Sequence, residues 1–260
     1  MDYSAIVRQY DRDRFVLSLF LPEEARNAAH VLLAWNLEIT RLREQVREPM
    51  VGFVRLQWWR EALDALYTGD VQRHELLPPL AEIVQRYGIE RAWFEDVLVA
   101  REQDFSDEPL RDMRALEAYL QGTSSSLLRM MAQVLGAQHE LLQPLGVAWG
   151  ALGVLRALPY HAKHGVLLLP EITPGASESA VKEVCGDVLE LAASSLEQVR
   201  SCQDEISEAL HPLMLYAVQS ERILKRMKKQ LNIDLWARCR MSARDAAALY
   251  MRAKRQNYAI

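Results

Sequence analysis

The stretch RLQWWREALDALYTG, residues 55–69, shows most directly how this chain folds. Its apolar residues include Trp58, Trp59, Ala62, Leu63, Leu66 and Tyr67. They recur every three or four residues, which is the period of an α-helix with one face against a core. Thr68, Gly69 and Asp70 follow, and glycine with short polar residues commonly ends a helix. The stretch therefore predicts a helix that is buried along one side.

The same period runs through most of the chain, and almost no β-branched alternating run competes with it. Helices are predicted over Ala25–Val46, Leu76–Arg86, Ile89–Asp104, Met113–Gly136, Leu141–Leu158, Ala180–Ser201, Leu213–Leu231 and Ser242–Ala253. Only Val166–Leu169, between Gly165 and Pro170, is a candidate for extended structure. No break in composition divides the chain, so we predict one all-α domain over residues 1–260, with the aromatic and Met side chains mainly in its core.

The composition excludes several classes of protein. The chain has 260 residues, of which 50% are hydrophobic and 25% charged, and its formal net charge of -4 gives no general attraction to nucleic acid. The longest run without charged or strongly polar residues is Pro144–Leu155, shorter than the about 20 residues that cross a bilayer. The three cysteines, Cys185, Cys202 and Cys239, are expected to be free thiols. We therefore expect a cytoplasmic protein.

Positive charge is concentrated at the C-terminal end. Residues 221–260 contain eleven Lys and Arg and three Asp and Glu, a formal charge of +8. Ile223, Leu224, Met227 and Leu231 form an apolar stripe among these cations. One interpretation is a closing helix that packs on the core and leaves a solvated cationic face. The other is contact with an acidic partner or an anionic membrane, which would place the protein peripherally at the inner membrane surface.

Five segments, taken in order, resemble the squalene/phytoene synthase family. They are FVLSLFLPEEAR (15–26), RLQWWREALDALYTG (55–69), EAYLQGTSSSLL (117–128), GVLRALPYHAKHGVLLLP (153–170) and LYAVQSERILKRMKKQLNIDLWARCRMS (215–242). The resemblance implies an isoprenoid-synthase (terpenoid synthase-like) helical bundle around a central apolar cavity. Active members of that family join two prenyl diphosphates, using Mg²⁺ held between two clusters of aspartates.

The resemblance also shows where those aspartates would lie. The first cluster falls on Thr40, Arg41 and Glu44, and the second on Gly153, Arg156, Ala157 and His161. Among these positions only Glu44 is a carboxylate, and only Arg156 matches the family pattern. Arg41 puts a cation where a metal ligand would sit, and a cation repels Mg²⁺. We therefore expect no catalytic residues and no cofactor, with Mg²⁺ bound only if the chain is an active transferase.

The combination is similar to the subgroup of this family that contains the mitochondrial complex I assembly factor, which has WNLE-like and LRALPYH-like sequences in place of the aspartates. That likeness implies a non-catalytic assembly or binding factor with protein partners in respiratory complex assembly. One alternative is a prenyltransferase that uses Glu44 and Glu48, one helical turn apart, as a displaced metal site. Another is a lipid-binding protein that holds a prenyl chain or other lipid in the pocket.

Further polar groups allow two interpretations each. Glu44 and Glu48, interleaved with Arg41, Arg43 and Arg47, form either that metal site or a solvated, salt-bridged helix end. A second group consists of the cationic side chains of Arg156, His161, Lys163 and His164. These side chains either contact an anion, such as a phosphate or a lipid head group, or have ordinary surface roles. Carboxylates also cluster at Asp104, Asp107 and Glu108, and at Asp204 and Glu208. Gly146, Gly150 and Gly153 share one helix face, where they permit tight packing or line a pocket.

Overall fold

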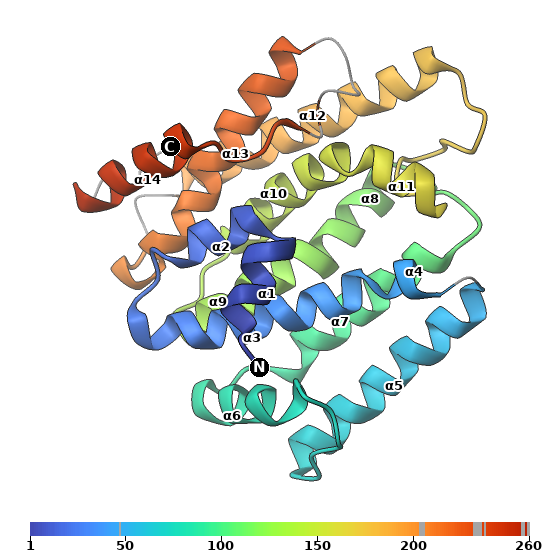
Figure 1. Ribbon diagram of the computed structural model, residues 1–260. Coiled ribbons are helices and arrows are strands. Elements are labelled where there is room, and N and C mark those ends of the chain that lie inside the picture. Colours follow the sequence, from blue (N-terminus) through green and yellow to red (C-terminus); the bar gives the residue numbers. More distant parts are fainter. Residues whose placement is uncertain (47, 203–205, 231–235, 237, 256–257, 259–260) are drawn as a thin grey trace.

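The computed structural model describes residues 1–46, 48–202, 206–230, 236, 238–255 and 258. Its helices are α1 (Tyr3–Tyr10), α2 (Arg12–Ser18), α3 (Glu23–Thr40), α4 (Leu42–Gln45), α5 (Pro49–Thr68), α6 (Leu77–Tyr87), α7 (Arg91–Arg101), η1 (Glu102–Phe105), α8 (Met113–Leu120), η2 (Gln121–Ser125), α9 (Ser126–Val134), α10 (Leu142–Arg156), α11 (Leu158–His164), α12 (Glu178–Ser201), η4 (Glu208–Leu210), α13 (His211–Lys229) and α14 (Ala243–Lys254) (Figure 1). These residues contain no strand, so the all-α prediction is confirmed.

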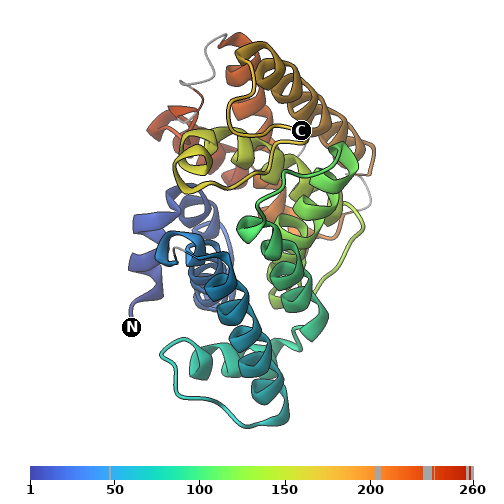
Figure 2. The same cartoon turned by 90° about the vertical axis from the view of Figure 1, so that its right-hand side faces the viewer.

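Helix α10 lies at the centre of the bundle. It packs against α12, α13, α9 and η2, and 11 of its 15 residues are buried. A helix that is apolar on every side can bury its surface only if other helices surround it. Helices α12, α13 and α14 lie on one side of α10, and α5 and α6 lie on the opposite side (Figures 1 and 2). The longest run without charged or strongly polar residues, Pro144–Leu155, therefore forms most of the central helix of the bundle.

The glycines of α10 have two different roles. A Cβ on Gly146 would lie 2.3 Å from the Cα of Ser125, and one on Gly150 would lie 2.7 Å from the hydroxyl of Ser124. Both serines belong to η2, so these two glycines let η2 approach the α10 backbone. Tight packing is thus confirmed for Gly146 and Gly150. A Cβ on Gly153 would meet nothing within 4 Å, so Gly153 faces open space.

Several helix boundaries differ from the predicted ones. The helix predicted over 25–46 begins at Glu23 and stops at Thr40, and α4 follows as a separate turn. The helix predicted over 113–136 is divided by the π-helix η2, and α1, α2 and α11 were not predicted. Helix α10 ends at Arg156 because Pro159 has no N–H to donate to the Leu155 carbonyl, and its ring would clash with that carbonyl if the helix continued. Val166–Leu169 is irregular, without a strand. The predicted end at Leu231 lies outside the described residues.

Large aromatic side chains fill the core as expected, with exceptions on α5. Trp35 meets Phe94 edge to face at 4.8 Å, and Trp149 meets Tyr216 at 4.9 Å. On α5, Trp59 is buried, whereas Met50 and Trp58 are among its exposed apolar side chains. The three cysteines are free thiols, as predicted. No helix in the described part of the chain has the length and apolar character needed to span a bilayer.

Candidate functional site

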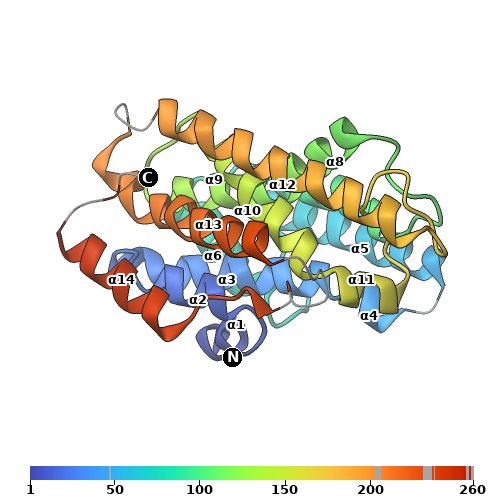
Figure 3. The same cartoon turned by 90° about the horizontal axis from the view of Figure 1, so that it is seen from above.

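The two segments that the resemblance assigns to the family's aspartate clusters meet at one end of the bundle. The end of α3 with α4 supplies one segment, and the end of α10 with α11 supplies the other. Helices α4 and α11 lie side by side in two perpendicular views (Figures 1 and 3). A Cβ on Gly165, directly after α11, would lie 3.4 Å from Nη2 of Arg43 on α4. The fold therefore brings the positions of the two clusters together.

The first cluster position is occupied by an ion pair. Arg41, between α3 and α4, donates from Nε to Oε2 of Glu44 at 3.0 Å, and its guanidinium lies 4.1 Å from the ring centre of Tyr10. Thr40 donates its hydroxyl to the Asn36 carbonyl at 2.7 Å. Burial, together with the nearby Glu44 carboxylate, raises the pKa of Tyr160 to about 12. Glu44 is thus already engaged by a cation of its own turn.

The spacing predicted for Glu44 and Glu48 is wrong. Glu44 lies in α4, but Glu48 is the extended N-cap residue of α5, with φ -100° and ψ 128°. The following Pro49 disfavours helical backbone at Glu48, so the two carboxylates do not share one helix face. A salt bridge at the helix end, with Glu44, is the interpretation that the structure supports.

The second cluster position lines a pocket of about 450 Å³. Its lining residues include Tyr10, Arg12, Asp13, Gly153, Arg156, Ala157, Tyr160 and Arg240. Arg156 donates from Nη1 to Oδ2 of Asp13 at 2.6 Å, and its guanidinium also lies 5.5 Å from the ring centre of Trp149. The side chains of Asp13 and Arg156 are 8% and 16% exposed, so this is a largely buried ion pair. Its carboxylate comes from α2, which the family pattern does not use for metal.

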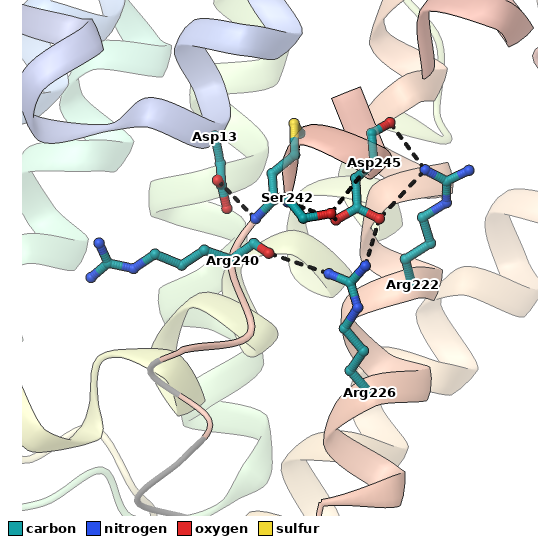
Figure 4. Close-up of polar contacts among 7 residues, drawn as sticks. Asp13, Arg222, Arg226, Arg240, Ser242 and Asp245 are labelled. Atoms are coloured by element: carbon teal, nitrogen blue, oxygen red, sulfur yellow. Dashed lines mark hydrogen bonds and ion pairs between the residues drawn. The ribbon is translucent and has the colours of Figure 1, made fainter. Parts of the chain in front are cut away.

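Asp13 also holds the chain that leads into α14. Its Oδ1 accepts the backbone N–H of Met241 at 3.1 Å (Figure 4). One carboxylate therefore joins α2, the end of α10 and the segment before α14, which are far apart in the sequence. A buried carboxylate that accepts charge-assisted bonds on both oxygens is well satisfied.

The proposed cationic group on α11 does not act as one cluster. Burial lowers the pKa of His161 to about 4, aided by the positive charges of Arg101 and His164, so His161 is uncharged at neutral pH. Nδ1 of His164 lies 2.9 Å from the Tyr160 carbonyl, and Lys163 is exposed. His161 lines a different pocket from Arg156. The structure therefore does not gather these side chains around one anion.

Arg101, Asp104 and Tyr119 form a separate, largely buried polar cluster. Arg101 donates from Nη1 to Asp104 at 3.1 Å and to the Tyr119 hydroxyl at 2.7 Å, and Tyr119 donates to the other oxygen of Asp104 at 2.7 Å. Asp104 is thus a structural partner, apart from the exposed Asp107 and Glu108. Glu208 begins η4, and Asp204 lies outside the described residues.

These residues do not fit a magnesium–diphosphate centre. Mg²⁺ in proteins is held by carboxylates, usually with substrate phosphates. The described residues contain no group of three or more His, Cys, Asp or Glu side chains that could hold a metal ion. At the two cluster positions, Glu44 is paired with Arg41, and Gly153 and Ala157 offer no ligand.

Three important residues were missed at the sequence level. Asp13 and Arg101 lie on helices whose charged residues show no distinctive spacing, and Tyr160 belongs to a short helix that the periodicity did not predict. Asp13 stands in RDRF (12–15), close to a segment already recognised as family-like, which was the available signal. Its pairing with Arg156, 143 residues away, had no signal in the sequence.

A family model described as squalene/phytoene synthase matches residues 7–245. The chain belongs to the squalene/phytoene synthase family. Relatives in this family include the Bos taurus protein named NADH dehydrogenase (ubiquinone) complex I, assembly factor 6, which is 28% identical over 248 residues, or 89% of this chain and 74% of that protein. The Homo sapiens protein of the same name is 27% identical over 241 residues, or 86% of this chain and 72% of that protein.

Solved structures confirm the isoprenoid-synthase fold of this squalene/phytoene synthase family member. A dehydrosqualene synthase in complex with ligand matches with a TM-score of 0.78 and 15% identity, covering 98% of this chain and 94% of that chain. The squalene synthase HpnC from Alicyclobacillus acidocaldarius matches with a TM-score of 0.74 and 16% identity, covering 88% and 92%. At such low identity the likeness concerns the fold alone.

Replacing Asp13→Asn should destabilise the protein, because the substitution leaves the Arg156 guanidinium largely buried without its counter-charge. We expect the free energy of unfolding to fall by about 3 kcal/mol in denaturant titrations. Glu178→Gln is the matched control, since the exposed Glu178 pairs with Lys182 on the surface of α12 and should cause no measurable change. Equal stability of Asp13→Asn and the wild type would show that the pair does not hold these segments.

His161 predicts a specific pH dependence of stability. Its folded-state pKa is about 4, below the ordinary value of 6.5, so the unfolded chain takes up the proton first as the pH falls. Stability is therefore lost between pH 6.5 and 4, and His161→Gln should remove about 1–2 kcal/mol of that loss at pH 5. Unfolding titrations of both proteins at pH 7 and pH 5 measure the difference. An NMR protonation step of the His161 ring near neutral pH would contradict the assignment.

Proposed function

We propose that this chain is a non-catalytic assembly or binding factor for the respiratory NADH dehydrogenase, complex I. The observation that carries the proposal is that the carboxylates at or beside the two cluster positions, Glu44 and Asp13, are already engaged in ion pairs. Arg41 engages Glu44 at the first cluster position, and Arg156 engages Asp13 at the second. The relatives that are named assembly factors support the choice of partner.

The physical reason lies in the charge that a departing diphosphate develops. Prenyl transfer needs divalent cations to neutralise the leaving group, and those cations need clustered carboxylates. In this chain Glu44 and Asp13, the carboxylates nearest to the two cluster positions, are each bound to an arginine. The helical scaffold is kept, while the groups that would bind Mg²⁺ are replaced. A protein partner, rather than a prenyl diphosphate, is therefore the binding target that we assign.

Deleting the gene should lower the amount of assembled NADH dehydrogenase, measured by activity staining of native gels of membranes from the cells that encode this chain. The wild-type gene and a gene carrying Glu44→Gln with Glu48→Gln should restore assembly equally, because the proposed function needs no metal-binding carboxylate. Normal assembly after deletion would refute the proposal. Restoration by the wild type alone would point instead to the prenyltransferase alternative.

A separate assay with the purified protein tests the transferase alternative directly. The purified chain, incubated with farnesyl or geranylgeranyl diphosphate and Mg²⁺, should give no condensed product. Turnover that disappears in the Glu44→Gln protein would establish a transferase of the squalene/phytoene type.

A lipid-binding role is the second candidate, favoured by an apolar groove of about 420 Å³. The groove lies between α11, the segment after it and the start of α12, and its lining residues include Leu158, Leu168, Ile172 and Val181. Native mass spectrometry of the purified protein should then detect bound lipid. Val181→Trp should displace it by filling the groove, whereas Val99→Trp, at an exposed position on α7, should leave it bound. Absence of lipid from the wild type would remove this candidate.

A further inference from the structure

Helix α14 is attached to the bundle mainly through polar contacts at its first turn. Asp245 and Leu249 are its buried residues, so a single large apolar side chain anchors the helix. Ser242 and Asp245 form a capping box, in which each side chain accepts from the backbone N–H of the other. The orientation of α14 therefore depends on how Asp245 is held.

Two arginines of α13 hold Asp245 (Figure 4). Arg226 donates from Nη2 to Oδ1 of Asp245 at 2.5 Å, and Arg222 donates to the Asp245 carbonyl at 3.2 Å. Burial by itself would raise the pKa of Asp245, but the hydrogen bonds from Arg226 and Ser242 outweigh burial and keep that pKa below its ordinary value. The carboxylate therefore remains charged at neutral pH, and the Asp245 side of α14 stays turned toward α13.

The opposite side of α14 carries exposed apolar side chains. Tyr250 is 59% exposed and Met251 is 45% exposed, and Ala247, one turn earlier, is also exposed. Arg244 and Lys254 lie three or four residues from these positions, and both are exposed. Residues at this spacing share one helix face, so a small apolar centre is bordered by cations at both ends.

Helix α14 carries more positive than negative charge. The one acidic residue of α14 is Asp245, which is buried and paired, whereas Arg244, Arg252 and Lys254 belong to the same helix and Arg255 follows it. The last 40 residues carry +8 in a chain whose net charge is -4. An anionic surface therefore attracts the positively charged C-terminal part of the chain and repels the negatively charged remainder.

We propose that the outer face of α14, formed by Arg244, Ala247, Tyr250, Met251 and Lys254, docks on an anionic lipid membrane. An interfacial helix needs apolar side chains that enter the head-group region and cations that meet the lipid charges, and this face offers both. Exposed Tyr suits such a boundary, because its ring is apolar and its hydroxyl remains in water. The polar anchor at Asp245 presents the face outward without requiring α14 to unfold.

Flotation with lipid vesicles tests the proposal on the full-length protein. The chain should bind phosphatidylcholine vesicles that contain phosphatidylglycerol, bind pure phosphatidylcholine vesicles weakly, and dissociate as salt is raised. Met251→Ser and Lys254→Glu should each weaken binding, with a loss of about tenfold for the charge reversal. Circular dichroism and thermal unfolding should match the wild type, since both side chains are exposed.

Two control variants test whether the membrane contact lies on α14. Met50→Ser changes a methionine on α5 that is more exposed than Met251, at 69% against 45%, and Lys163→Glu reverses an exposed lysine on α11, so both should bind as the wild type does. Loss of binding in these controls, but not in the α14 variants, would overturn the assignment to α14. Failure of the wild type to float with anionic vesicles at low salt would overturn the membrane proposal, and an acidic protein would then be the partner to seek for this face.

Discussion

A buried carboxylate, Asp13, holds together three segments that are distant in the sequence. It pairs with Arg156 at the end of the central helix α10 and accepts the N–H of Met241 ahead of α14. A charge in this environment is tolerated only because both oxygens are bonded and the counter-charge is close. The position of the N-terminal helices, the end of α10 and the C-terminal helix is thus coupled through one side chain.

The same ion pair determines what the site can do. In a metal-dependent synthase of this family, the space between the two cluster positions has to concentrate negative charge. Here that space is bordered by arginines whose charges are matched within the protein, at Asp13 and at Glu44. Both pairs are compatible with the fold because each arginine has its counter-charge within hydrogen-bond distance.

Charge is also separated along the molecule. Arg101 and Arg156 are largely buried and paired with carboxylates, whereas Arg244 and Lys254 of α14 are turned outward by the capping box at Ser242 and by the arginines of α13. The apolar side chains Tyr250 and Met251 are exposed by the same arrangement. A binding factor that meets its partner at a membrane would use these two properties together: an inert interior and a surface helix suited to lipid.

The sequence by itself determined the all-α class, most of the long helices and the family, because helical periodicity and local motifs depend on neighbours within a few residues. It did not determine that Glu44 and Glu48 do not share one helix, although Pro49 was visible as the reason. Nor did it determine that Asp13 meets Arg156, or that His161 is uncharged. Those properties were decided by tertiary structure, because an ion pair between remote helices and the desolvation of an imidazole exist only after the chain has brought distant residues into contact.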